Sequence, residues 1–171
     1  MTNYPPPPRT KILLAVTPDM RERLGRILAR HDLTTVGTSD EAMQALEDKH
    51  GIVILGVHFD DSQMFSLLGD IRAHSGYRKV PILCVLGSRG RAITDIAVEG
   101  LDHAVKAMRA NGFLDLSHFA DDEEGNGRIR RIVDYLILID GDLQHIARQT
   151  DEPAAAPAEE RRRPAAAMLK S

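Results

Sequence analysis

Short apolar runs alternate along the chain with segments in which apolar residues recur every three or four positions. Runs that are apolar at nearly every position are typical of strands covered on both faces of a parallel sheet. Apolar residues at i, i+3, i+4 and i+7 are typical of a helix with one buried side. The pattern predicts five strands, at residues 11–16, 33–37, 52–59, 80–86 and 113–116.

Helical segments fall between and after these strands, at residues 19–31, 40–49, 62–74, 91–110 and 128–149. Ser39 precedes the second helix, where a hydroxyl can cap free N–H groups. The predicted inward set of the fourth helix comprises Ile93, Ile96, Leu101, Ala104, Val105 and Met108. Strands that alternate with helices require parallel pairing and right-handed crossovers. We therefore expect an α/β fold, a doubly wound five-stranded parallel sheet, and the short strands favour the flavodoxin-like order 2-1-3-4-5.

Both ends of the chain differ in composition from this centre. Residues 1–10 contain four consecutive prolines, which predict a flexible, extended arm. Residues 150–171 are mostly Ala, Pro, Glu and Arg, too polar to offset their ordering entropy, and predict a disordered tail. One domain is therefore expected at 11–149, with a last helix extended by Leu138, Ile139, Leu143 and Ile146.

Composition limits the classes of function. A net charge of -3 and 4% aromatic residues argue against a nucleic-acid partner. No apolar stretch approaches the ~20 residues of a membrane span. The single cysteine, Cys84, lies in an apolar run, so we expect a buried thiol and a reducing, cytoplasmic location. The histidines lack metal-ligand spacing and no catalytic triad motif occurs, so no metal, cofactor or enzyme activity is expected.

Several phrases resemble response-regulator receiver domains and occur in the family's order. They are KILLAVTPDMR at 11–21, SDEAMQAL at 39–46, IVILGVHFDD at 52–61, LLGDIR at 67–72, VPIL at 80–83 and GFLD at 112–115. The resemblance covers roughly residues 10–140. It implies a bacterial, stand-alone module of a two-component or phosphorelay signalling pathway.

Receiver domains carry phosphate on an Asp that ends the third strand. An acidic pair after the first strand holds Mg²⁺, and a hydroxyl and a lysine follow the fourth and fifth strands. The resemblance assigns these positions to residues without that chemistry: Gly56 for the acceptor, Val16 and Thr17 for the acidic pair, Leu86 or Gly87 for the hydroxyl, and Leu116 for the lysine. It therefore implies a degenerate pseudo-receiver that acts by phosphorylation-independent protein–protein interaction.

Two alternatives stay open. Asp60 and Asp61 follow Gly56 closely and are candidates for a displaced acceptor in a phosphorelay receiver. The second alternative is a nucleotide or anion-binding loop before a helix, where backbone amides and guanidinium groups favour an anion. Its residues, which do not form a Walker motif, are Ser88, Arg89, Gly90 and Arg91.

The last two helices carry more apolar residues than one inward stripe can bury. A surplus of this kind is typical of an association face. The candidate residues are Leu101, Val105, Leu136, Leu138, Ile139 and Leu143. In the receiver family, the face of the fourth helix, fifth strand and fifth helix commonly forms dimers. We therefore expect a homodimer or a protein partner at this face, with a last helix folded back on its own domain as the alternative.

Overall fold

The computed structural model describes residues 5–89 and 93–151, and the surroundings of side chains as far as residue 141. Residues 1–4 of the predicted arm and residues 152–171 of the predicted tail lie outside the described residues. Gly90 and Arg91 of the predicted anion loop also lie outside them, as does the side chain of Leu143.

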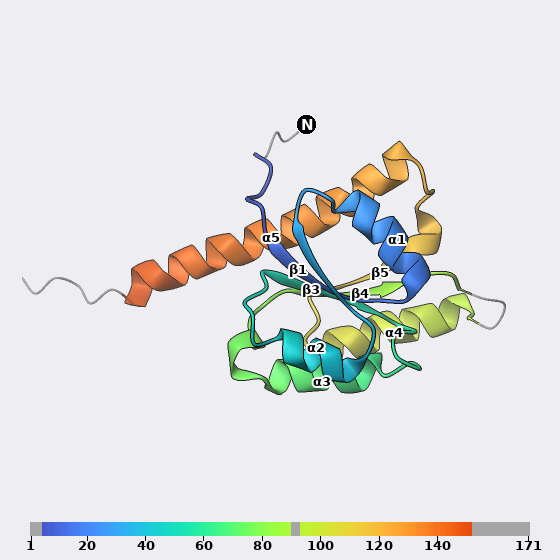
Figure 1. Ribbon diagram of the computed structural model, residues 1–171, viewed down its shortest axis with the longest axis horizontal. Coiled ribbons are helices and arrows are strands. Elements are labelled where there is room, and N and C mark those ends of the chain that lie inside the picture. Colours follow the sequence, from blue (N-terminus) through green and yellow to red (C-terminus); the bar gives the residue numbers. More distant parts are fainter. Residues whose placement is uncertain (1–4, 90–92, 152–171) are drawn as a thin grey trace, which may run out of the picture.

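The sheet has five parallel strands in the predicted order, β2-β1-β3-β4-β5 (Figure 1). The strands are β1 (Lys11–Ala15), β2 (Asp32–Val36), β3 (Ile52–Gly56), β4 (Ile82–Leu86) and β5 (Gly112–Asp115). Every residue of β3 and β4 is buried, because helices cover both faces of the sheet. The register pairs Ala15 with Leu55 and Gly56 with Val85, so the residues that follow these strands meet at one edge.

Helices cover the two faces of the sheet in separate groups. The elements outside the sheet are α1 (Pro18–Ile27), α2 (Ser39–Ala45), α3 (Met64–Ala73), α4 (Asp95–Ala107), α5 (Glu123–Asp151) and the short 3-10 turns η1 (Ser75–Tyr77) and η2 (Leu116–His118). Apolar residues of α1 and α5 pack on one face, and those of α2, α3 and α4 on the other. The doubly wound α/β fold predicted from the sequence is confirmed.

Cys84 lies in the second of these two cores, the one beneath α3 and α4. Its thiol is free and the residue is 0% exposed, as the apolar run around it predicted. Burial disfavours the charged thiolate and raises the pKa of Cys84 to about 12. The residue acts as a small apolar side chain of the core.

At α2 and α4, a threonine cap sets a helix start that differs from the predicted one. Thr38, not Ser39, caps α2, because its hydroxyl accepts the N–H of Glu41. The helix predicted from residue 91 begins only at Asp95, where the hydroxyl of Thr94 accepts the N–H of Ala97. In both cases a threonine hydroxyl satisfies an N–H that has no partner inside the helix.

The inward set predicted for the fourth helix was also wrong at one position. Ile96 is 82% exposed, whereas Val105 of the same helix is fully buried. The helix ends before Arg109, whose φ of 67° cannot continue a right-handed helix.

The last helix is the longest element, and its predicted extension is confirmed. α5 has 29 residues and begins before the predicted residue 128, because the Asp122 carboxylate accepts the N–H of Gly125 at 2.8 Å. Figure 1 shows the C-terminal part of α5 projecting past the sheet. No helix in the described ranges is long and apolar enough to cross a bilayer.

The described part of the N-terminal arm lies against α5. Pro7 is buried, while Pro5 and Pro6 are exposed. Together these three prolines and α5 residues, including Tyr135 and Leu138, line a hollow of about 290 Å³.

Candidate functional site

The carboxyl ends of β1, β3, β4 and β5 meet at the edge where the receiver resemblance places a phosphorylation pocket. Val16 follows β1, Gly56 ends β3, Gly87 follows β4, and Leu116 follows β5. A turn stops β3 at Gly56, whose carbonyl accepts the N–H of Phe59 at 3.1 Å. The structure therefore brings together the positions that the resemblance identified.

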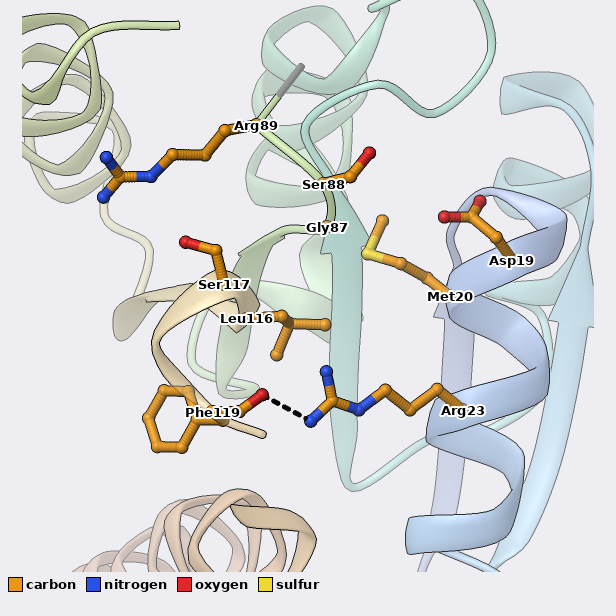
Figure 2. A pocket seen from close by; sticks show the side chains of 9 residues that line it. All are labelled: Asp19, Met20, Arg23, Gly87, Ser88, Arg89, Leu116, Ser117 and Phe119. Atoms are coloured by element: carbon orange, nitrogen blue, oxygen red, sulfur yellow. Dashed lines mark hydrogen bonds between the residues drawn. The ribbon is translucent and has the colours of Figure 1, made fainter. Parts of the chain in front are cut away.

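Met20 of α1 fills the space between the two glycines of this edge. A β-carbon added to Gly56 would lie 2.8 Å from Met20 Cε and 3.3 Å from the Val16 Cα. One added to Gly87 would lie 3.0 Å from Met20 Sδ. Figure 2 shows the Met20 side chain reaching from α1 toward Gly87. Met20 is only 4% exposed. Its side chain occupies the space beside Gly56 and Gly87, where a larger residue would place its own side chain.

The same edge is lined by aliphatic side chains. Val16 is 1%, Leu86 0% and Leu116 3% exposed. Val16, Met20 and Leu116 belong to one apolar cluster with core residues of α1 and α5. In receiver domains these positions carry carboxylate, hydroxyl and ammonium groups, whereas here they carry hydrocarbon. Within the described ranges, no three His, Cys, Asp or Glu residues are grouped so as to hold a metal ion.

A shallow hollow of about 390 Å³ opens beside Met20. Its lining residues, drawn in Figure 2, are Asp19, Met20, Arg23, Gly87, Ser88, Arg89, Leu116, Ser117 and Phe119. Arg23 donates to the carbonyls of Phe119 and Ala120, both at 2.8 Å. The guanidinium of Arg23 thus joins α1 to the segment before α5.

Arg89, from the predicted anion loop, also pairs with other residues of the protein. Its Nε donates to Asp115 Oδ2 at 2.6 Å, and a second nitrogen pairs with Asp95 at the start of α4. A third contact joins it to His118 Nε2 at 3.0 Å. Hydrogen bonds with Asp95 and Asp115 raise the pKa of Arg89. Since Ser88 is exposed and uncharged, the described part of this loop offers no uncommitted cation.

Asp115, which sequence reasoning missed, is the buried acid of this edge. It is 6% exposed and its Oδ1 accepts both the N–H and the hydroxyl of Ser117, at 3.0 and 2.6 Å. Burial alone raises the pKa of Asp115, but the hydrogen bonds from Ser117 and Arg89 outweigh it and hold the pKa below its ordinary value. The ionised carboxylate therefore ties the end of β5 to the loop after β4.

The loop after β3 carries the candidates for a displaced acceptor. Asp60, Asp61 and Ser62 have φ of 46°, 53° and 66°, and these left-handed residues delay α3 to Met64. Asp60 Oδ2 accepts the N–H of Ser39 at 2.8 Å, and this bond lowers the pKa of Asp60. Asp60 thus serves the first turn of α2, while Asp61 is exposed.

The structure places one residue of the predicted association face in the core, and the face itself stays a prediction. Val105 is fully buried against the sheet, so it cannot contact a partner. The other described members are partly buried: Leu101, Leu136, Leu138 and Ile139. Sequence reasoning missed Tyr135, which is 60% exposed on α5. The signal was its spacing from Leu138 and Ile139, three and four positions away on the same helix.

The edge of β5 is flanked by two hollows. On the α5 side, a hollow of about 590 Å³ has apolar walls that include Phe113 and Tyr135 and a rim with Arg128 and Arg131. On the α4 side, a hollow of about 720 Å³ is lined by both signs of charge: Asp95, Glu99, Asp102 and Asp115 lie beside Arg89, Lys106 and Arg128. Arg89 pairs with Asp95 and Asp115, and Lys106 pairs with Asp102. This α4–β5–α5 face therefore combines an apolar centre with a basic rim on the α5 side and mixed, largely paired charges on the α4 side.

Comparison with known proteins supports the fold. No protein-family model and no curated protein matches this sequence. The chemotaxis response regulator CheY4 of Vibrio cholerae is similar in structure, with 21% identity and a TM-score of 0.57 over 74% of this chain and 99% of that one. A phosphorylated cyanobacterial phytochrome response regulator, RcpA, has 15% identity and a TM-score of 0.56 over 75% and 91%.

NtrX from Brucella abortus has 18% identity and a TM-score of 0.64 over 83% of this chain. The matched region is only 30% of NtrX, so this chain corresponds to one part of that larger protein. At such identities the likeness shows the fold alone. The chain has the fold of response-regulator receiver domains.

Proposed function

We propose that this chain is a pseudo-receiver, a signalling module of a two-component-type pathway that acts by protein contact and accepts no phosphoryl group. The observation that carries the proposal is the position of Met20, whose side chain packs against Gly56 and Gly87 where receivers hold their phosphorylation chemistry. The receiver fold supports the assignment to two-component signalling.

The chemistry of phosphoryl transfer supports the same conclusion. A carboxylate attacks phosphorus efficiently when a cation neutralises the phosphoryl oxygens, and the product is a highly charged group. Placing that charge beside Val16, Met20 and Leu116 would remove it from water without a partner, which is costly. We therefore do not assign enzymatic activity to this edge.

Arg89, which follows β4, is already paired without a phosphoryl group. Arg89 joins Asp115 at the end of β5 to Asp95 at the start of α4. One guanidinium thus links the strand and the helix of the α4–β5–α5 face. This link supports a face in which β5 and α4 keep the same relative position without phosphorylation.

Incubation of the full chain with acetyl phosphate and Mg²⁺, followed by intact-mass measurement, tests the proposal. We expect no mass increase, while a conventional receiver domain treated in parallel gains one phosphoryl group. A stable adduct that disappears in Asp60→Asn or Asp61→Asn would replace the proposal with a displaced acceptor. An adduct on any other Asp would overturn it as well.

The proposed binding surface is the α4–β5–α5 face, and the proposed partner is a protein. Its apolar centre and the exposed arginines beside α5 are suited to a partner that offers an apolar surface and acidic residues. Arg131→Glu reverses the charge of the basic rim at an exposed position. We expect this variant to bind its partner more weakly, and we expect its binding to depend less on salt concentration. Light scattering measures self-association, and pull-down measures binding of another protein.

A further inference from the structure

Residues 5–10, the arm before β1, have a backbone that their own sequence restricts. Proline fixes φ at about −65°, and a residue that precedes proline is held in the extended region. Pro5, Pro6 and Pro7 each precede a proline, which favours the polyproline II conformation. This left-handed helix has three residues per turn, so residues three positions apart share one edge.

One edge of the arm packs on the domain. Pro7 is buried, and Thr10, three residues later, donates its N–H to His31 Nδ1 at 3.2 Å. The carbonyl of Thr10 accepts the N–H of Asp32 at 3.0 Å, which holds the end of the arm beside β2. Figure 1 shows the arm running beside α5 before it enters β1. Pro7 and Thr10 therefore form the inward edge that a three-residue period predicts.

The other two edges of the arm face solvent. Pro5 and Pro8 form one of them, Pro6 and Arg9 form the other, and all four residues are exposed. The hollow of about 290 Å³ between the arm and α5 leaves further open space beside Pro5 and Pro6. Because proline has no N–H, the backbone from residue 5 to residue 8 offers rings and carbonyl oxygens, but no donors.

Arg9 adds a positive charge to one exposed edge. Two of its guanidinium nitrogens donate to Asp32 Oδ1, at 2.9 and 2.5 Å. The side chains of Arg9 and Asp32 are 71% and 54% exposed, and an ion pair this open to water contributes little to stability. Arg9 can therefore exchange Asp32 for a carboxylate of another protein at small cost.

We propose that residues 5–9 are a docking strand for a partner protein whose groove is lined by aromatic side chains and carries a carboxylate at one end. Proline-rich segments bind in grooves of this kind, where their rings pack on aromatic side chains. The carboxylate of the groove would pair with Arg9. The inference goes beyond the proposed function, because it assigns a partner to a second surface of the chain.

The domain holds this strand ready for binding. Since proline rings restrict the backbone, a polyproline segment loses little conformational entropy when it binds. Pro7 and Thr10 fix one edge of the strand as well, which lowers that cost further. The strand precedes β1, whereas Gly56 ends β3, so the two lie at opposite ends of the parallel strands. Docking at the arm is therefore separate from the phosphorylation edge.

Isothermal titration of the full chain with two purified WW domains tests the proposal. WW domains bind polyproline II segments in an aromatic groove. The first probe carries a carboxylate at the end of its groove, and in the second probe the matching amide replaces that carboxylate. We expect the first probe to bind at least about fivefold more tightly than the second. Arg9→Gln should abolish this difference, and Pro8→Ala should weaken binding of both probes at least about fivefold.

Two matched variants control for the loss of a proline or a charge elsewhere. Pro18→Ala removes an exposed proline at the start of α1, and Arg78→Gln removes an exposed arginine that follows η1. Both should bind the probes as the natural chain does. If neither probe bound the natural chain, or if the controls lost as much affinity as Pro8→Ala and Arg9→Gln, the proposal would be overturned.

A purely structural role of the arm would give a different result. Pro7→Ala removes a buried ring and should lower Tm, whereas Pro8→Ala and Arg9→Gln change exposed side chains and should nearly keep the Tm of the natural chain. A lower Tm for Pro7→Ala without binding of either probe would make the arm a structural strap and exclude the docking strand. Uptake of a phosphoryl group is measured separately, so this inference and the proposed function can each fail alone.

Discussion

The Cε methyl group of Met20 lies 2.8 Å from the point where a β-carbon of residue 56 would stand. Gly56→Ala should therefore destabilise the protein, because both residues are buried and Val16 Cα closes the other side at 3.3 Å. Overpacking of this kind costs about 1–3 kcal/mol. The free energy of unfolding, measured in urea, checks this value.

The coupling between residues 20 and 56 provides the control for that prediction. Met20→Ala leaves a cavity and costs about 2–5 kcal/mol alone, but it also removes the methyl group that a new β-carbon meets. Gly56→Ala should then cost clearly less in the Met20→Ala background than in the natural chain. Equal costs in both backgrounds would show that Met20 does not occupy the space above Gly56.

A second stability prediction concerns the buried guanidinium of Arg72, which is 4% exposed. It donates to the carbonyls of Tyr77, Val80 and Arg109 at 2.8, 2.7 and 2.7 Å, and to Asn111 Oδ1 at 2.9 Å. Arg72→Met keeps the bulk but removes the side-chain donor from the three carbonyls, while Asn111 Oδ1 still accepts the N–H of Ile82 at 2.9 Å. Since each buried unpaired group costs about 1–3 kcal/mol, the loss should be about 3 kcal/mol or more.

The matched control for Arg72 is Arg78→Met, at the exposed position that directly follows η1. Surface changes of this type usually stay within about 0.5 kcal/mol. Urea unfolding of both variants at pH 7 measures the difference. If Arg72→Met were no more destabilising than Arg78→Met, the carbonyl network would have no structural role.

The sequence predicted the fold well because the spacing of apolar residues depends on which faces of each strand or helix are buried. Every residue of the run at β3 is buried, as a strand covered on both faces requires. Helix ends were less predictable, because local hydrogen bonds set them. Thr94 and Thr38 cap helices whose starts periodicity placed elsewhere. Ile96 shows the remaining limit, since one apolar residue can lie on the solvent side of its helix.

The site was predictable only as a set of positions. Alignment with the receiver pattern identified Gly56, Leu116 and their neighbours, which the parallel register brings to one edge. Nothing in the sequence pointed to Met20 as the residue that fills the space, because its inward position in α1 fits any core methionine. The pairing of Arg89 with Asp115 joins residues 26 positions apart, and only the tertiary structure reveals it.

The Arg89–Asp115 pair should make stability depend on pH in the acid range. Bonds from Ser117 and Arg89 hold the pKa of Asp115 below its ordinary value despite burial. The ionised carboxylate therefore stabilises the fold above the unfolded pKa of about 3.9. This contribution is lost as the pH falls through the lower, folded pKa.

Asp115→Asn tests that dependence. We expect it to cost about 1.5–3 kcal/mol at pH 7, the usual worth of hydrogen bonds to a charged group. The difference in unfolding free energy between the variant and the natural chain should shrink as the pH falls below about 4, because the natural carboxylate then also loses its charge. Urea unfolding at pH 7 and pH 3 measures both values, with the exposed Asp19→Asn as control. A deficit that stayed constant with pH would contradict the role of the ionised form.

His50 should produce a second pH dependence, nearer neutrality. Its Nδ1 lies 3.1 Å from the carbonyl oxygen of Asp48 and 3.0 Å from the Tyr77 hydroxyl, which itself donates to that same carbonyl. Nδ1 must therefore carry the proton of the neutral ring. Burial first, and then the charge of Lys11, lower the pKa of His50.

Because the folded pKa of His50 lies below the unfolded value of about 6.5, the neutral ring favours the folded state. Stability is then complete above pH 6.5 and falls as the pH drops from about 6.5 toward the folded pKa. His50→Gln should lose less stability than the natural chain between pH 7.5 and pH 5, measured as the shift in Tm. The decline should not vanish, since burial lowers the pKa of His31 in the same direction. The exposed His58→Gln should follow the natural chain, and a His50→Gln profile that also did so would exclude His50 as a source of the dependence.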